Sequence, residues 1–167
     1  MTTSSTLKTS SPEPNVLEAI TPGLVLKLTP PRLRKSLLPR ERLRQMRENA
    51  DGVEVILVEA PAGYGKTSLL AQWRLDWLHA GAVVTWFDLD SDDSVTSLGS
   101  GIIEGLRRAS GRADFGHDAL EAIRRGSGFT HAATSLLAEI AENAHPTVII
   151  LDNGERPKNP ELMDLCN

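Results

Sequence analysis

The segment APAGYGKT, from Ala60 to Thr67, constrains the fold of this chain more than any other stretch. It follows an apolar, β-branched run at residues 53–60, VEVILVEA, and precedes a run whose apolar residues recur at helical spacing up to Gly81. The first run lacks full alternation, which is typical of a strand buried on both faces in a parallel sheet. The sequence therefore predicts a strand, a glycine-rich turn and a helix that ends at Gly81.

This turn has the spacing G-x-x-x-x-G-K-[ST] of a phosphate-binding loop, with Ala60 in place of the first glycine. The first N–H groups of a helix are unpaired and carry a partial positive charge, so they can surround a polyphosphate. The lysine adds a point charge for the β and γ phosphates, and the threonine hydroxyl is a hard oxygen ligand for Mg²⁺. The alternative is a tight strand-to-helix turn without a ligand. The pattern predicts that ATP binds to Ala60, Gly63, Tyr64, Gly65, Lys66, Thr67 and Ser68.

The rest of the chain alternates strand and helix patterns. Residues 82–90 and 147–153 are apolar runs of strand length, and three segments between them have helical periodicity, the first opening at Val95 after capping residues. This alternation predicts a doubly wound α/β fold, in which helices flank a parallel sheet.

An acidic residue, Asp152, ends the last apolar run. Ligands of open α/β sheets bind at the carboxyl ends of the strands, so Asp152 is expected to hold Mg²⁺ through water, together with Thr67. Its alternative is an Asp-Asn-Gly turn after a strand. Many nucleoside triphosphatases place a second acid next, but this chain has Asn153, which cannot accept a proton from water. Glu155 is the candidate substitute, and slow or absent hydrolysis is expected.

Composition narrows the class of protein. A formal charge of −4 gives no chain-wide attraction to nucleic acid or anionic membranes, and the single cysteine, Cys166, excludes an internal disulfide and fits the cytoplasm. No apolar run has the ~20 residues of a membrane helix. Residues 1–20 are rich in Ser, Thr and Pro and are expected to form a disordered arm. Residues 21–167 are expected to form one partial P-loop domain.

Two charged runs allow more than one interpretation. The basic run at residues 32–47 is more consistent with a solvated helix face than with a nucleic-acid-binding arm, because it has no interleaved aromatic residues. The acidic run DLDSDD, at residues 88–93, has hard oxygen ligands for a metal, but such a cluster after a strand more often caps the next helix, here through Asp93 or Ser94.

Four phrases, in this order, resemble the nucleotide-binding domain of the MalT-like STAND ATPases, which are large regulators of the LuxR family. They are LKLTPPRLRKSLLPRERL, VEAPAGYGKTSLLAQW, VVTWFDLDSDDS and VIILDNGERPKNPELMDL. The resemblance implies an ATP-dependent signalling switch that self-associates, with Arg40 on the base side of the nucleotide. It also implies that DNA is bound only by a C-terminal domain absent from this chain.

The chain departs from these relatives in two ways. They usually have two acids where this chain has Asp152 and Asn153, and they continue into a further strand that lies between the phosphate-loop strand and the acidic strand. The resemblance therefore implies a parallel sheet of the P-loop NTPase type that is incomplete at its C-terminal end. Without the further strand, the two strands would have to close a gap or leave apolar edges and unpaired backbone groups exposed. A P-loop kinase or other phosphotransferase, a truncated non-functional fragment or binding module, and a nucleic-acid binder remain alternatives.

Overall fold

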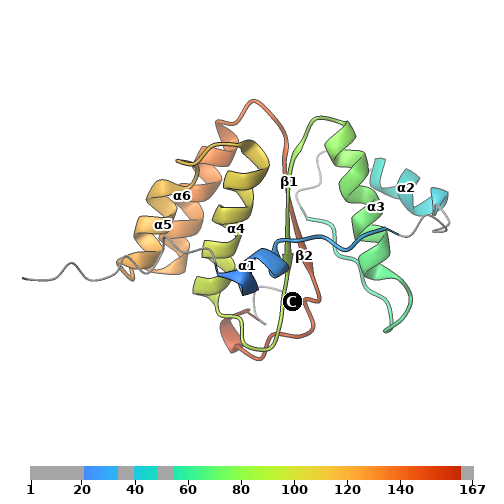
Figure 1. The fold of residues 1–167 in the computed structure, drawn as a ribbon, viewed down its shortest axis with the longest axis horizontal. Helices are drawn as coiled ribbons and strands as arrows, with labels where there is room; N and C mark the ends of the chain where they lie inside the picture. Colours follow the sequence, from blue (N-terminus) through green and yellow to red (C-terminus); the bar gives the residue numbers. More distant parts are fainter. Residues whose placement is uncertain (1–20, 34–39, 49–54, 163–167) are drawn as a thin grey trace, which may run out of the picture.

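The computed structural model describes residues 21–33, 40–48 and 55–162, and its centre is a pair of parallel strands (Figure 1). Strand β1 (Val83–Asp88) pairs in parallel with β2 (Thr147–Asp152). In this register Val83 lies opposite Thr147, and Asp88 lies opposite Asp152. The ladder continues where the Leu89 amide donates to the Asp152 carbonyl at 3.1 Å. Two of the predicted strands therefore form, and they are parallel as predicted.

Helices cover both faces of this pair (Figure 1). On one side lie α4 (Val95–Ser110), α5 (His117–Arg124) and α6 (Phe129–Ala141), which together connect β1 to β2. On the other side lie α3 (Lys66–His79) and α2 (Glu41–Glu48), and the short α1 (Pro22–Lys27) lies near β1. The fold is thus a mixed α/β arrangement with a small two-stranded sheet between helical layers.

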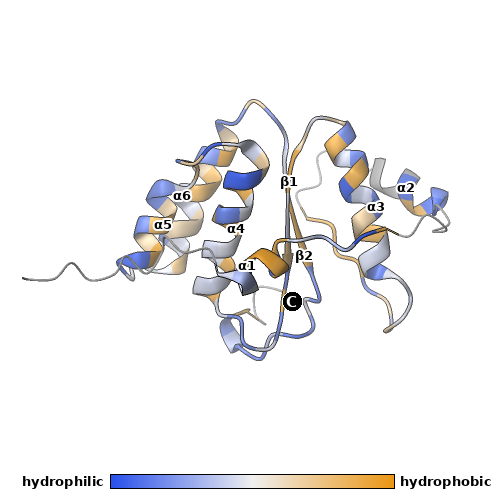
Figure 2. Ribbon diagram, in the orientation of Figure 1, coloured by the Kyte–Doolittle hydropathy of each residue, from blue (hydrophilic) through white to orange (hydrophobic). Residues whose placement is uncertain are grey.

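Strand β1 is buried on both faces because helices cover each of them. Val84 and Trp86 pack with Ala71 of α3, whereas Phe87 packs with Leu98 of α4. Figure 2 shows hydrophobic residues along both strands. A strand that is buried on both faces needs apolar residues at nearly every position, which accounts for the near-continuous apolar run at residues 82–90.

Two glycines let α4 approach β1 closely. A Cβ atom on Gly101 would lie 2.1 Å from Cε2 of Phe87, and one on Gly105 would lie 1.9 Å from the Thr85 hydroxyl oxygen. Both distances are shorter than atoms can tolerate, so the helix-to-strand spacing depends on the absence of side chains at these positions.

The predicted strand before the glycine-rich turn does not form in the described residues. Residues 55–60 have no strand structure, and Val53 and Glu54 lie outside the described residues. Val55 and Leu57 are 79% and 68% exposed, and Ile149 and Leu151 of β2 are also exposed. A strand needs hydrogen-bonded neighbours, and β2 pairs only with β1 among the described residues, so residues 55–60 have no partner. The expected exposed apolar edge is therefore present.

The ends of the helices largely follow the sequence. Ser94 caps α4 in a capping box with Ser97, and α3 ends just before Gly81, whose φ is 82°. The amphipathic pattern of residues 130–146 predicts that Leu136, Leu137 and Ile140 point inward, and this prediction is wrong for Leu137 of α6, which is 62% exposed. The predicted arm at residues 1–20 and Cys166 lie outside the described residues.

Candidate functional site

The glycine-rich turn forms a loop that leads directly into α3. Gly63 and Gly65 have φ of 82° and 81°, a left-handed conformation that glycine adopts without steric cost. Gly65 is the N-cap of α3 and has no side chain to accept hydrogen bonds from the first turn. The N–H groups at the start of α3 therefore remain available as donors, as an anion site requires.

Lys66 is the first residue of α3, and its ammonium group turns back to the beginning of the loop. Its Nζ donates to the carbonyl oxygen of Ala60 at 2.8 Å, so the lysine joins the two ends of the loop. Ser68, also in the first turn, is half-buried. The lysine charge is thus held within the loop that leads into α3, where it would add to the attraction of the first-turn N–H groups for an anion.

Thr67 connects the loop to the end of β2. Its hydroxyl donates to Oδ1 of Asp152 at 3.1 Å, although the two residues are 85 positions apart in the sequence. Asp152 is 5% exposed, so its carboxylate is largely withdrawn from water. The structure thus brings together the hydroxyl and the carboxylate that sequence analysis assigned to Mg²⁺.

The two candidate residues after Asp152 differ in their contacts: Asn153 has a hydrogen-bond partner and Glu155 has none among the described residues. Asn153 has φ of 59°, and its side-chain amide donates to Oδ1 of Asp88 at 2.6 Å, which ties the carboxyl ends of the two strands together. Glu155 is exposed and makes no hydrogen bond or ion pair within the described part of the chain. Asn153 therefore has a structural partner, and Glu155 is not brought to the loop by any such contact.

Arg40, the residue before α2, contacts the backbone of the glycine-rich loop. Its Nη2 donates to the carbonyl of Tyr64 at 2.7 Å and would lie 3.0 Å from a Cβ atom on Gly65. The structure therefore places Arg40 against the loop backbone. In the neighbouring α2, Arg44 pairs with Asp76 of α3 at 3.4 Å, which links α2 to the helix that carries the candidate site.

The acidic run after β1 binds a lysine that sequence analysis did not single out. Lys27 of α1 lies 2.6 Å from both Asp90 and Asp93. Burial lowers the pKa of Lys27, but hydrogen bonds and charge from the two aspartates outweigh it, and the net pKa is raised. The hydrogen bond from Lys27 is the main cause of a lowered pKa at Asp90. No group of three or more potential metal ligands was found in the part of the chain that the structure describes.

Asp93 also organises the turn before α4. It is 5% exposed and accepts hydrogen bonds from the Asp90 amide at 2.9 Å and the Ser97 hydroxyl at 3.0 Å. The interpretation of this run as a cap is therefore supported. Lys27 was missed because it lies 66 positions from Asp93 and carries no local signal of a partner.

Comparisons with known proteins identify two kinds of relative. The chain is 35% identical over 125 residues to the serine/threonine-protein kinase PknK of Mycobacterium tuberculosis; the match covers 72% of this chain and 11% of the kinase. It is also 28% identical over 139 residues to the HTH-type transcriptional regulator MalT of Klebsiella pneumoniae. This match covers 83% of this chain and 15% of the regulator.

Two other comparisons gave no match: no family model matches the chain, and no solved structure matches it. Among the described residues, no helix is both long enough and apolar enough to span a membrane. The chain is thus similar to a small part of MalT, a transcriptional regulator, and to a small part of PknK.

Proposed function

We propose that this chain is the ATP-binding signalling domain of a MalT-like regulator of the LuxR family, in which the bound nucleotide sets the signalling state. The observation that carries this proposal is the hydrogen bond from Thr67 to Asp152 at 3.1 Å. It joins the residue after the loop lysine to the acid that ends β2, which is the pairing that a Mg²⁺–triphosphate site uses.

The binding chemistry follows from the residues around the loop. The free N–H groups of the first turn of α3 would donate to phosphate oxygens. The Lys66 ammonium group would leave the Ala60 carbonyl and donate to the β and γ phosphates instead. Thr67 and Asp152 would hold Mg²⁺, the aspartate through water. Because residues 55–60 form no strand, the proposed nucleotide site would be held in place by the start of α3 and by the end of β2.

The two relatives favour a regulatory domain over a phosphotransferase. One is named a protein kinase and the other a transcriptional regulator, yet this chain is similar to 11% of the first and 15% of the second. A region similar to parts of proteins with such different names is better explained by a shared signalling role than by either activity. Self-association in the active state is part of this proposal.

Hydrolysis is proposed to be slow or absent. The amide of Asn153 is held by Asp88, and an amide cannot take a proton from an attacking water. Glu155 is exposed and unpartnered among the described residues, so nothing holds it at the loop.

The test is equilibrium binding of a fluorescent ATP analogue to the 167-residue chain with and without Mg²⁺. We expect saturable, Mg²⁺-dependent binding that is lost in Lys66→Ala and kept in Lys158→Ala, which removes an exposed lysine outside the site. Nucleotide should also raise the unfolding temperature of the wild type, because a ligand that binds only the folded state stabilises it. Folded protein that binds no nucleotide at millimolar concentration would contradict the proposal.

A further inference from the structure

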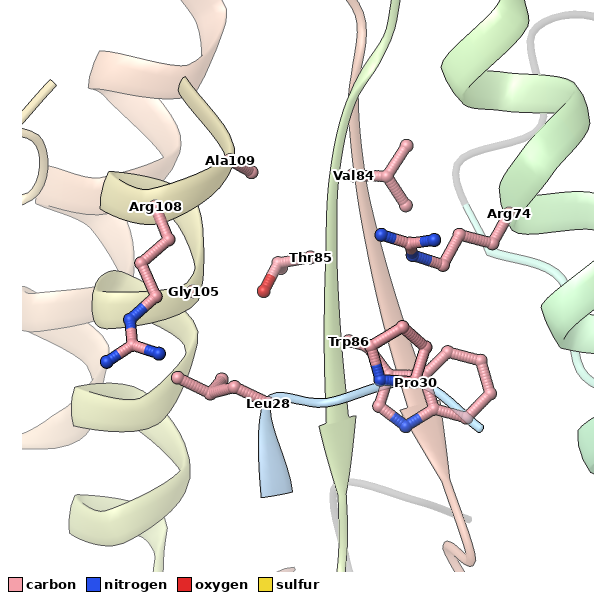
Figure 3. Close-up of a pocket in the computed structure, with 9 residues that line it drawn as sticks. All are labelled: Leu28, Pro30, Arg74, Val84, Thr85, Trp86, Gly105, Arg108 and Ala109. Carbon is pink, nitrogen blue, oxygen red and sulfur yellow. The ribbon is translucent and has the colours of Figure 1, made fainter. Parts of the chain in front are cut away.

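A second site is suggested by a cavity of about 200 Å³ on the opposite edge of the sheet from the exposed apolar edge (Figure 3). It lies where β1 passes between α3 and α4, and Leu28 and Pro30 border it. None of the loop residues Ala60 to Ser68 lines it, so it is separate from the proposed nucleotide site.

The cavity contains a guanidinium group without a counter-charge. In Figure 3 the Arg74 side chain projects from α3 toward β1. Its Nε is buried and has no hydrogen-bond partner, and no ion pair involves Arg74 among the described residues. Burial lowers the pKa of Arg74, and no acidic neighbour opposes this effect. Arg74 as a whole is half-buried, so its charge keeps part of its hydration, but no acid neutralises it, and an anion in the cavity would pair with it.

A buried hydroxyl group is also without a partner. Thr85 is 2% exposed, and its hydroxyl, which projects from β1 toward α4 in Figure 3, makes no hydrogen bond. Buried polar groups are nearly always paired, but this oxygen is packed against Gly105 of α4, on the face of β1 away from Arg74, so it is not part of the ligand contact.

The backbone of β1 offers further donors. In a parallel pair, alternate N–H groups point to opposite sides, and the amides of Val83 and Leu89 donate toward the β2 side. The amides of Val84 and Trp86 therefore point to the other edge, where no strand pairs with β1 among the described residues. Both residues line the cavity.

We infer that this cavity, with Arg74 and the free edge of β1, binds a small organic acid that has one carboxylate and an apolar tail. The planar guanidinium matches a carboxylate in a bidentate pair. The other arginine of the cavity, Arg108, already pairs with Glu104 at 3.0 Å, so one uncompensated positive charge remains and a monoanion neutralises it.

The size of the cavity and the residues of its walls determine which apolar tail of the acid can fit. Leu28, Pro30 and Ala109 supply apolar surface. A cavity of about 150 Å³ is sufficient to hold benzene. An aromatic or branched aliphatic acid therefore fits, whereas inorganic phosphate would leave the apolar walls unused.

The test is a titration of the ¹⁵N-labelled 167-residue chain with sodium benzoate at constant ionic strength, followed by NMR. Acetate, inorganic phosphate and chloride serve as comparisons. We expect saturable shifts of the Val84 and Trp86 amides and of the Arg74 Nε–H, tighter for benzoate than for acetate. Arg74→Gln should weaken benzoate binding at least about tenfold, since it removes a charged hydrogen-bond donor. The matched control Arg108→Gln should change the affinity less than about threefold.

Arg74→Lys keeps the charge but loses the planar fork, so it should bind with intermediate affinity and serves if Arg74→Gln is unfolded. Thr85→Val replaces the buried, unpaired hydroxyl by a methyl group of similar shape and should not lower stability. Three results would overturn the inference: no saturable shift with benzoate, equal affinity in the wild type and the folded Arg74 variants, or phosphate or chloride binding as tightly as benzoate.

Discussion

The hydroxyl of Thr67, in the first turn of α3, donates to Oδ1 of Asp152, the last residue of β2, at 3.1 Å. This bond fixes the start of α3 against the carboxyl end of the sheet. Because Asp152 is 5% exposed, its carboxylate depends on such partners to offset its lost hydration.

Removing this hydroxyl is expected to affect both folding and nucleotide binding. Thr67→Val should lower the free energy of unfolding by about 1–3 kcal/mol, because it leaves a buried acceptor unpaired. The proposed Mg²⁺-dependent part of ATP affinity should fall about tenfold or more. Thr67→Ser keeps the hydroxyl and should retain most of both quantities. Urea denaturation and a Mg²⁺ titration measure them, and equal behaviour of the two variants would show that the hydroxyl is dispensable.

The bond from Asn153 to Asp88 is expected to make a second acid at position 153 unfavourable. Asn153→Asp would replace a donor 2.6 Å from the Asp88 carboxylate by a like charge, and should lose about 1–3 kcal/mol of stability at pH 7. Asn153→Gly also loses the hydrogen bond, but glycine adopts the φ of 59° freely and should be less affected. Urea denaturation of both variants checks the order, and an Asn153→Asp variant as stable as the wild type would contradict it.

The pairing of Lys27 with Asp90 predicts a pH dependence at both extremes. The pKa of Asp90 is lowered, so its contribution is complete above its unfolded value, about 4, and is lost as the pH falls below that. The pKa of Lys27 is raised, so its contribution is complete below about pH 10 and is lost as the pH rises through its folded value.

Lys27→Met should flatten the stability curve at both ends, because the neutral side chain removes both linkages. Lys158→Met, at an exposed position, should leave the shape of the curve unchanged. Chemical denaturation across the acid, neutral and alkaline ranges measures the effect, and parallel curves for wild type and Lys27→Met would refute it.

The close approach of α4 to β1 predicts that a helix-favouring substitution destabilises the protein. Alanine has a higher helix propensity than glycine by about 1 kcal/mol. Gly101→Ala should nevertheless lose about 1–3 kcal/mol, because the new Cβ would lie 2.1 Å from Phe87. Gly99→Ala is the control, since its nearest neighbour is the flexible end of Ile123 at 3.0 Å. Thermal unfolding compares the two, and equal stability would mean that β1 and α4 can separate without cost.

The exposed residues before the loop predict a small cost for truncating Leu57. Leu57→Ala should change stability by less than about 0.5 kcal/mol, because the side chain is 68% exposed. The matched substitution Leu69→Ala, at a residue that is 5% exposed, should lose about 2–5 kcal/mol. Binding of a hydrophobic dye should decrease in Leu57→Ala. A large loss of stability there would show that the segment is buried in solution.

The sequence by itself determined the elements whose signals are local. The glycine-rich turn, the start of α3 at Lys66, the cap of α4 at Ser94 and the end of α3 before Gly81 all depend on neighbouring residues. The parallel pairing of β1 and β2 was also predictable, because apolar runs of strand length between helical segments indicate a parallel sheet.

Only the tertiary structure decided which of the apolar runs became strands and which distant groups met. Residues 55–60 have a strand-like sequence but no hydrogen-bonded neighbour among the described residues, and a strand forms only in pairs. The contacts of Lys27 with Asp90 and of Asn153 with Asp88, and the unpaired Arg74, depend on packing between elements far apart in the chain. Local sequence carries no information on such separations, because side chains that are remote in sequence meet only when the layers pack.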